Sequence, residues 1–89
     1  MAMRGIRGAT TVETNSKDEI WSAAQELVTK ILSLNGIRAE NICAIIFSST
    51  KDITAAFPTT GLRQLKAFNL VPLFDAVEPD IENSLPMCI

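Results

Sequence analysis

The chain has 89 residues, of which 47% are hydrophobic and 20% charged, and its formal net charge is −2. This length predicts one small domain. The apolar composition predicts self-association, because a lone small domain has too little interior to bury so many hydrophobic side chains. The eight Lys and Arg residues are scattered and leave no basic footprint for nucleic acid. No apolar run approaches the roughly 18 residues that span a bilayer, and the first residues lack the apolar core of a signal peptide. We therefore expect a cytoplasmic protein with neither a nucleic-acid nor a membrane partner.

The chain contains no histidine. This removes the usual general base, the usual metal ligand and any Ser-His or Cys-His nucleophile pair. With Cys43 and Cys88 as its two cysteines, it offers neither a disulfide framework nor a zinc motif. The four carboxylates within residues 75–82 lack the glycine-punctuated spacing of a calcium loop. We therefore expect no metal site.

Residues 3–12 have the pattern of a first strand. Alternation along such a strand puts Arg7 on the same face as Gly5, with Gly8 beside it in the sequence. Because glycine has no side-chain bulk, a ligand or a neighbouring chain could approach the guanidinium closely. Its planar fork of donors suits a carboxylate or a phosphate. The alternative is a solvated arginine whose charge protects an edge strand from aggregation.

A capping box, Ser16–Glu19, predicts the start of an amphipathic helix. Apolar residues follow at helical spacing, and Asn35-Gly36 ends the pattern, which gives a helix of about 18 residues. Trp21 in its first turn is expected to pack in the core or an interface rather than to stack on a ligand.

The run Ile42–Phe47 is continuously apolar, which indicates a strand covered on both faces. The polar residues 48–52 follow its carboxyl end, where α/β folds tend to place ligands. Phe57-Pro58 precedes a second helix, from about Thr59 to Ala67, on which Arg63 and Lys66 share a face that is either solvated or functional.

The C-terminal part predicts two further strands. Leu70–Phe74 reads as a short strand, and Pro72 within it indicates an edge or a strand start. Leu85–Ile89 begins another apolar strand and then stops.

A set of short motifs spreads over the whole chain. They are Arg4–Glu13, Phe57-Pro58, Arg63, Val71-Pro72-Leu73, Glu78, Leu85-Pro86 and Cys88-Ile89. Together they resemble the small monofunctional chorismate mutases of the trimeric, mixed α/β type. The resemblance runs in register, without gaps, over essentially the whole chain, and the opening decapeptide is highly specific.

The resemblance implies an α+β fold in which a mixed β-sheet packs with helices, as one domain over residues 1–89. Three such chains would form a homotrimeric pseudo-barrel with active sites at the subunit interfaces. Neighbouring subunits would then cover the second face of the strand at residues 42–47.

The activity that the resemblance implies is the pericyclic rearrangement of chorismate to prephenate, on the way to phenylalanine and tyrosine. Such a reaction needs no nucleophile, general base, metal or organic cofactor, which fits the missing histidine. Catalysis then rests on holding the compact conformer of the substrate and on charges matched to the transition state.

The resemblance also implies roles for individual residues. Arg7 would bind a substrate carboxylate, and Glu78 would accept a hydrogen bond from the ring hydroxyl. Phe57 and Arg63 would come from the adjacent subunit, as an apolar wall and a positive charge. The residues expected to line the pocket along the preceding strand are Leu73, Phe74, Asp75, Ala76 and Val77.

This chain departs from the family in three places. Asp75 stands where relatives often have a thiol or a small neutral group, and Thr60 stands where many have a lysine. Both changes make the site less positive toward an anion. The family continues past Cys-Ile into an arginine, a further strand and a tyrosine, whereas this sequence ends at Ile89. We therefore expect a catalyst weakened on the order of 100- to 1000-fold. The alternatives are a non-catalytic trimeric module that binds a small carboxylate and a purely structural interaction protein.

Overall fold

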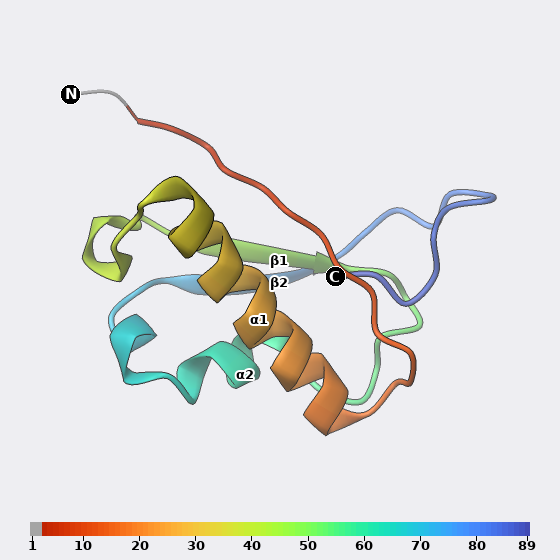
Figure 1. The fold of residues 1–89 in the computed structure, drawn as a ribbon. Coiled ribbons are helices and arrows are strands. Elements are labelled where there is room, and N and C mark those ends of the chain that lie inside the picture. Colours follow the sequence, from red (N-terminus) through yellow and green to blue (C-terminus); the bar gives the residue numbers. More distant parts are fainter. Residues whose placement is uncertain (1–2) are drawn as a thin grey trace.

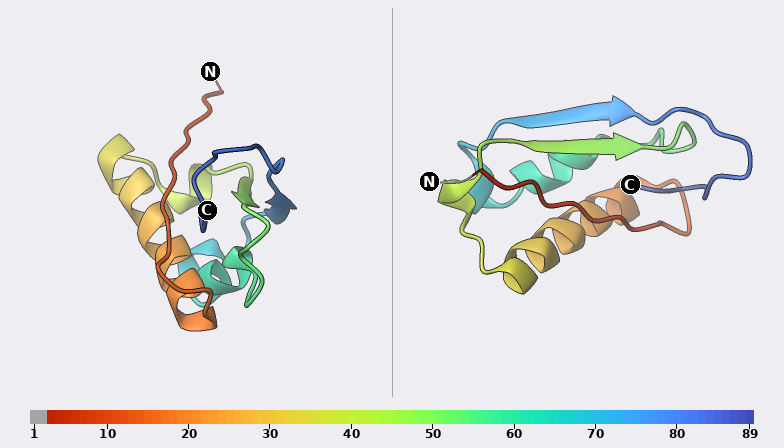
Figure 2. Two further views of the ribbon diagram at one scale, coloured as in Figure 1. Left: turned by 90° about the vertical axis from the view of Figure 1, so that its right-hand side faces the viewer. Right: turned by 90° about the horizontal axis from the view of Figure 1, so that it is seen from above.

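The computed structural model describes residues 3–89, which form two helices packed on one side of a two-stranded sheet (Figures 1 and 2). The elements in chain order are α1 (Lys17–Asn35), the 3₁₀ turn η1 (Ala39–Asn41), β1 (Ile45–Ser49), α2 (Pro58–Arg63), the 3₁₀ turn η2 (Lys66–Phe68) and β2 (Leu73–Val77). This arrangement agrees with the predicted α+β class. Within residues 3–89, neither helix is long and apolar enough to cross a membrane.

The long helix α1 forms as the sequence predicts, because both of its ends carry local signals. The Ser16 side chain accepts a hydrogen bond from the backbone N–H of Glu19, at 3.2 Å. Gly36 takes a left-handed conformation with φ of 61°, and its N–H donates to the carbonyl of Leu32. The reciprocal half of the capping box does not form, since the Ser16 N–H donates to the Thr14 carbonyl instead.

The small core lies between the helices and one face of the sheet. Trp21 packs against it, as predicted, while Ile20 and Leu62 are fully buried. The buried hydrophobic residues are Val12, Ile20, Ala24, Val28, Phe47, Leu62, Phe68, Val71 and Ile89.

The strands β1 and β2 are parallel, with Ile45 opposite Leu73 and Ser49 opposite Val77. Alternation gives this sheet two faces. The helix face carries Ile45, Phe47, Ser49, Leu73, Asp75 and Val77, and the outer face carries Ile46, Ser48, Phe74 and Ala76.

Within this chain the helix face of the sheet is covered along β1, whereas Val77 at the end of β2 is 74% exposed although it is on that face. Phe47 on the helix face is 4% exposed, whereas Ile46 and Phe74 on the outer face are 70% and 57% exposed. The prediction of a strand at residues 42–47 buried on both faces is therefore wrong in its bounds, and in the single chain one face stays open.

Four other predicted elements differ from the structure, and one of them is the strand expected at Leu85–Ile89, where only Cys88 makes an isolated β-bridge. The third strand starts at Leu73 rather than Leu70, and Pro72 before it uses its carbonyl to accept from the Ile45 N–H, at 2.9 Å. The second helix ends at Arg63, so Lys66 belongs to the separate turn η2. A strand over residues 3–12 is not formed, because a strand requires a partner and only Thr11 makes a β-bridge, to Cys88.

Residues 10–12 of the N-terminal segment and the C-terminal residues 87–89 lie side by side near the end of β1 (Figure 1). The Thr10 N–H donates to the Ile89 carbonyl and the Ile89 N–H donates back to Thr10, both at 2.9 Å. The Val12 N–H donates to Met87, also at 2.9 Å, and on the other side the Thr50 N–H donates to Cys88 at 3.0 Å. Residues 87–89 thus lie between the N-terminal segment and the chain that leaves β1.

Candidate functional site

Glu78 lies at the carboxyl end of β2, against the end of β1. Its N–H donates to the Ser49 carbonyl at 2.8 Å, which continues the pairing of the two strands by one residue. Its carboxylate accepts a hydrogen bond from the Ser48 hydroxyl at 3.1 Å. Since Ser48 is on the outer face, the Glu78 carboxylate is held on the side of the sheet that the helices leave open.

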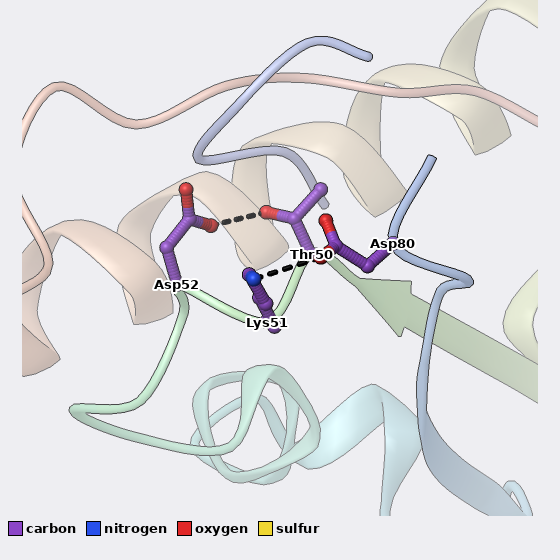
Figure 3. Close-up of polar contacts among 4 residues, drawn as sticks. All are labelled: Thr50, Lys51, Asp52 and Asp80. Carbon is purple, nitrogen blue, oxygen red and sulfur yellow. Dashed lines mark hydrogen bonds and ion pairs between the residues drawn. The ribbon is translucent and has the colours of Figure 1, made fainter. Parts of the chain in front are cut away.

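A hollow of about 310 Å³ adjoins Glu78. This volume falls in the range of small-molecule sites, roughly 300–1,000 Å³. Its walls are the chain after β1, at Thr50, Lys51 and Asp52, and the loop that follows Glu78, at residues 79–86. The ion pair between Lys51 Nζ and Asp80 Oδ2, at 2.7 Å, joins these two walls (Figure 3). The hydrogen bond to Asp80 raises the pKa of Lys51 above 10.5 and favours the charged pair.

Asp52 ties the chain after β1 to residue 87. Its carboxylate accepts from the Thr50 hydroxyl (Figure 3) and from the Met87 N–H, at 3.0 Å to Oδ2 and 3.2 Å to Oδ1. The Thr50 hydroxyl oxygen in turn accepts from the Cys88 N–H at 3.0 Å. The hydrogen bond from Thr50 lowers the pKa of Asp52 below its ordinary value of 3.8, and the bond from Met87 acts in the same direction.

Acidification is expected to weaken this attachment of Met87. Because the pKa of Asp52 is lower in the folded state, its contribution to stability is fully present above the unfolded-state pKa and is lost as the pH falls through the folded-state pKa. Between about pH 5 and pH 2, the unfolding temperature of the wild type should fall more steeply than that of Asp52→Asn, which has no proton to gain there. Parallel declines of the two proteins would contradict this role for the carboxylate.

Arg7 lies on the exposed N-terminal segment, and no ion pair to it is found within residues 3–89. A Cβ on Gly5 would meet nothing within 4 Å, as the sequence predicts. A Cβ on Gly8 would lie 3.0 Å from Ile31 Cδ1 and 3.3 Å from Leu27 Cδ1 of α1. The expected open space beside Gly8 is therefore wrong, because α1 fills it.

Arg63 lies at the opposite end of β2 from Glu78. Its guanidinium donates to the carbonyls of Phe68 at 2.6 Å, Asn69 at 3.0 Å and Val71 at 2.9 Å. Val71 precedes Glu78 by seven residues. An extended chain rises about 3.3 Å per residue, so roughly 20 Å separate the two positions. One chain therefore does not bring Arg63 and Glu78 together.

The remaining predicted residues divide between two sides of the sheet. Phe74 and Ala76 are on the outer face with Ser48, whereas Leu73, Asp75 and Val77 share the helix face. The Asp75 carboxylate accepts from both the backbone N–H and the hydroxyl of Thr59 in α2. Phe57, directly before α2, is 67% exposed.

Sequence reasoning missed the partners Ser48, Thr50 and Asp52. Their signal was present in the polar stretch 48–52, which predicts a ligand-binding loop but does not say which backbone groups each side chain would bind. Within the described part of the chain, no group of three or more Cys, Asp or Glu side chains is placed to hold a metal ion.

Comparison with known proteins finds close relatives over nearly the whole chain. The family model described as chorismate mutase type I matches residues 3–89. The chain is 44% identical to Chorismate mutase AroH of Thermus thermophilus over 88 residues. The matched region covers 98% of this chain and 71% of the relative. It is 37% identical over 89 residues to Chorismate mutase AroH of Bacillus subtilis, covering 100% and 70% of the two chains. A solved structure of chorismate mutase from Clostridium thermocellum is similar with a TM-score of 0.88 and 40% identity, over 93% of this chain and 73% of that one.

Proposed function

Because the chain belongs to the type I chorismate mutase family, we propose that it catalyses the rearrangement of chorismate to prephenate. The observation that carries this proposal is the family match over residues 3–89, which includes both Arg7 and Glu78. The 44% identity to the Thermus relative over 88 residues supports it. The two free cysteines, Cys43 and Cys88, fit the reducing cytoplasm, where we propose that the protein acts.

The reaction breaks the ether C–O bond of the substrate as a new C–C bond forms in the same molecule. No proton, electron pair or group has to pass to the protein, so the protein acts by holding the compact conformer and by matching charge. We assign the carboxylate contact to Arg7, whose guanidinium can bind a carboxylate through two parallel hydrogen bonds. We assign the ring hydroxyl to Glu78, whose Oε1 accepts from Ser48 and whose Oε2 accepts no hydrogen bond from residues 3–89.

We further propose that the working form is a homotrimer whose sites lie between subunits. Two observations support this assembly. The outer face exposes Ile46 and Phe74, a large apolar surface for so small a chain. Arg63 binds the Val71 carbonyl at the opposite end of β2 from Glu78, so a site that uses both needs Arg63, together with Phe57, from a neighbour. Phe74 and Ala76 would line such a site with their side chains, and the other residues of β2 through their backbone.

Glu78→Gln is expected to lower the rate of chorismate loss by between about 10- and 100-fold, because a hydrogen bond to a charged group becomes one to a neutral amide. The assay follows the absorbance of chorismate, and sedimentation checks that the assembly is unchanged. Stability should change little, since Glu78 adds little packing. The matched control is Glu26→Gln, on the exposed side of α1, which should retain full activity.

Equal losses of activity and stability in Glu78→Gln would point to a structural role for the carboxylate. Binding of a dicarboxylate transition-state mimic by the wild type, without turnover, would instead support the non-catalytic binding module.

A further inference from the structure

We propose that Thr50 and Asp52 are positioning residues for Arg7, which they hold in place through the backbone of residues 87–89. This inference rests on the proposed function, because it concerns how the substrate-binding arginine is placed. Neither residue needs to touch the substrate for the effect.

The first link joins the Thr50–Asp52 pair to residues 87 and 88. Asp52 accepts from the Met87 N–H at 3.0 Å, and the Thr50 hydroxyl both donates to Asp52 and accepts from the Cys88 N–H at 3.0 Å. The Thr50 N–H donates to the Cys88 carbonyl. The pair thus satisfies consecutive backbone N–H groups, and a hydrogen bond to a carboxylate is about twice as strong as a neutral one.

The second link joins residues 87–89 to the segment that carries Arg7. The backbone hydrogen bonds of residues 3–12 within the described chain all involve Met87 or Ile89. Thr10, the first residue bonded in this way, follows Arg7 by three positions. The packing of Gly8 against Ile31 and Leu27 fixes the direction of the segment between them. Loss of the first link therefore frees the attachment point of Arg7.

Residues 49–52 also determine where the Arg7 segment lies relative to Glu78. The Glu78 N–H is bonded to Ser49 and the Met87 N–H to Asp52, so both ends of the connection 78–87 are tied to one short stretch of chain. The distance between the Arg7 segment and Glu78 is then set by residues 49–52. Because a misplacement of about 1 Å can cost 100-fold in rate, a site with this arrangement depends on the Thr50–Asp52 pair.

The test compares Thr50→Val, which removes the hydroxyl at nearly constant shape, with Thr50→Ser, which keeps it. Asp52→Asn is the second variant, and Glu40→Gln, an exposed carboxylate in an ion pair with Arg38, is the matched control. Three quantities are measured in the full chain: amide hydrogen exchange at Thr10 and Val12, kcat and KM for chorismate, and the Kd for a dicarboxylate transition-state mimic. Exchange at the interior of α1 reports whether each variant is folded.

We expect Thr50→Val to speed exchange at Thr10 and Val12 and to lower kcat/KM and mimic affinity about tenfold. Asp52→Asn should show a smaller effect in the same direction, and Thr50→Ser and Glu40→Gln should match the wild type. In an Arg7→Ala background, Thr50→Val should cost less than about twofold, because its effect acts through Arg7.

An equal cost of Thr50→Val with and without Arg7 would overturn the inference, as would unchanged exchange at Thr10 and Val12. If the wild type neither turns over chorismate nor binds the mimic, the proposed function fails and the positioning role falls with it. If the wild type turns over chorismate and the costs of Thr50→Val and Arg7→Ala simply add, the proposed function stands and only the positioning role is rejected.

Discussion

Arg7→Ala is expected to weaken binding of a dicarboxylate transition-state mimic by at least about 100-fold, because it removes a charged, two-pronged partner of a carboxylate. The affinity of Arg7→Lys for the mimic should fall between those of the wild type and Arg7→Ala, since an ammonium keeps the charge but not the fork of donors. Stability should not change, because Arg7 is exposed and makes no ion pair within residues 3–89. Calorimetric titration gives the affinities, and thermal unfolding checks the fold.

The matched control for Arg7→Ala is Arg4→Ala. Arg4 lies on the same exposed segment, three residues before Arg7, and carries the same charge. The Arg4→Ala variant should bind the mimic with an affinity close to that of the wild type. Unchanged binding in Arg7→Ala, or equal losses in both variants, would remove Arg7 from the site and leave only a general electrostatic contribution of the segment.

Gly61→Ala is expected to destabilise the chain by about 3 kcal/mol, as overpacking at a close contact does. A Cβ on Gly61 would lie 2.7 Å from the Trp21 Cα and 3.0 Å from the Trp21 carbonyl oxygen. Backbone atoms of α1 have no rotamer by which to move away, so α1 and α2 must separate. The hydrogen bond from Gln25 Nε2 to the Gly61 carbonyl, at 2.8 Å, is then strained as well.

Urea unfolding at a fixed protein concentration measures this effect, with Gly5→Ala as the control. A Cβ on Gly5 meets nothing within 4 Å, so that variant should unfold like the wild type. Helix propensity alone would make alanine at position 61 more stable than glycine by about 1 kcal/mol. A stabilised or unchanged Gly61→Ala would therefore show that the helices are not in close contact at this point.

The sequence predicts α1 well because the signals at its ends are local. A serine hydroxyl three residues before a free N–H and a glycine in the left-handed region act within one turn of the chain. The bounds of α2 and β2 depend on distant partners instead. Arg63 binds the carbonyls of Phe68, Asn69 and Val71 and so turns the chain where apolar spacing alone continues the helix. Pairing with β1 places β2 at Leu73–Val77 rather than at the apolar run before it.

The candidate site was predicted in part. The resemblance to the family singles out Arg7 and Glu78, but alternation along one strand cannot show which side the helices cover. The sequence predicts open space at both Gly5 and Gly8. Only the packing of α1 shows that the space at Gly8 is filled and the space at Gly5 is not. The attachments of Asp52 join residues far apart in sequence, and no local pattern encodes such a contact.

The three carbonyls that hold the guanidinium of Arg63 have a consequence for the entropy of binding. A free arginine side chain gives up about 2 kcal/mol of rotamer freedom when it is fixed. Here that loss occurs as each chain folds, when Arg63 closes the turn at residues 68–71. Because backbone carbonyls are neutral, they hold the Arg63 guanidinium at a fixed position without cancelling its positive charge. In the homotrimer that we propose, a site of the neighbouring subunit would therefore use an arginine side chain that is already ordered, and binding of an anion would not have to immobilise it.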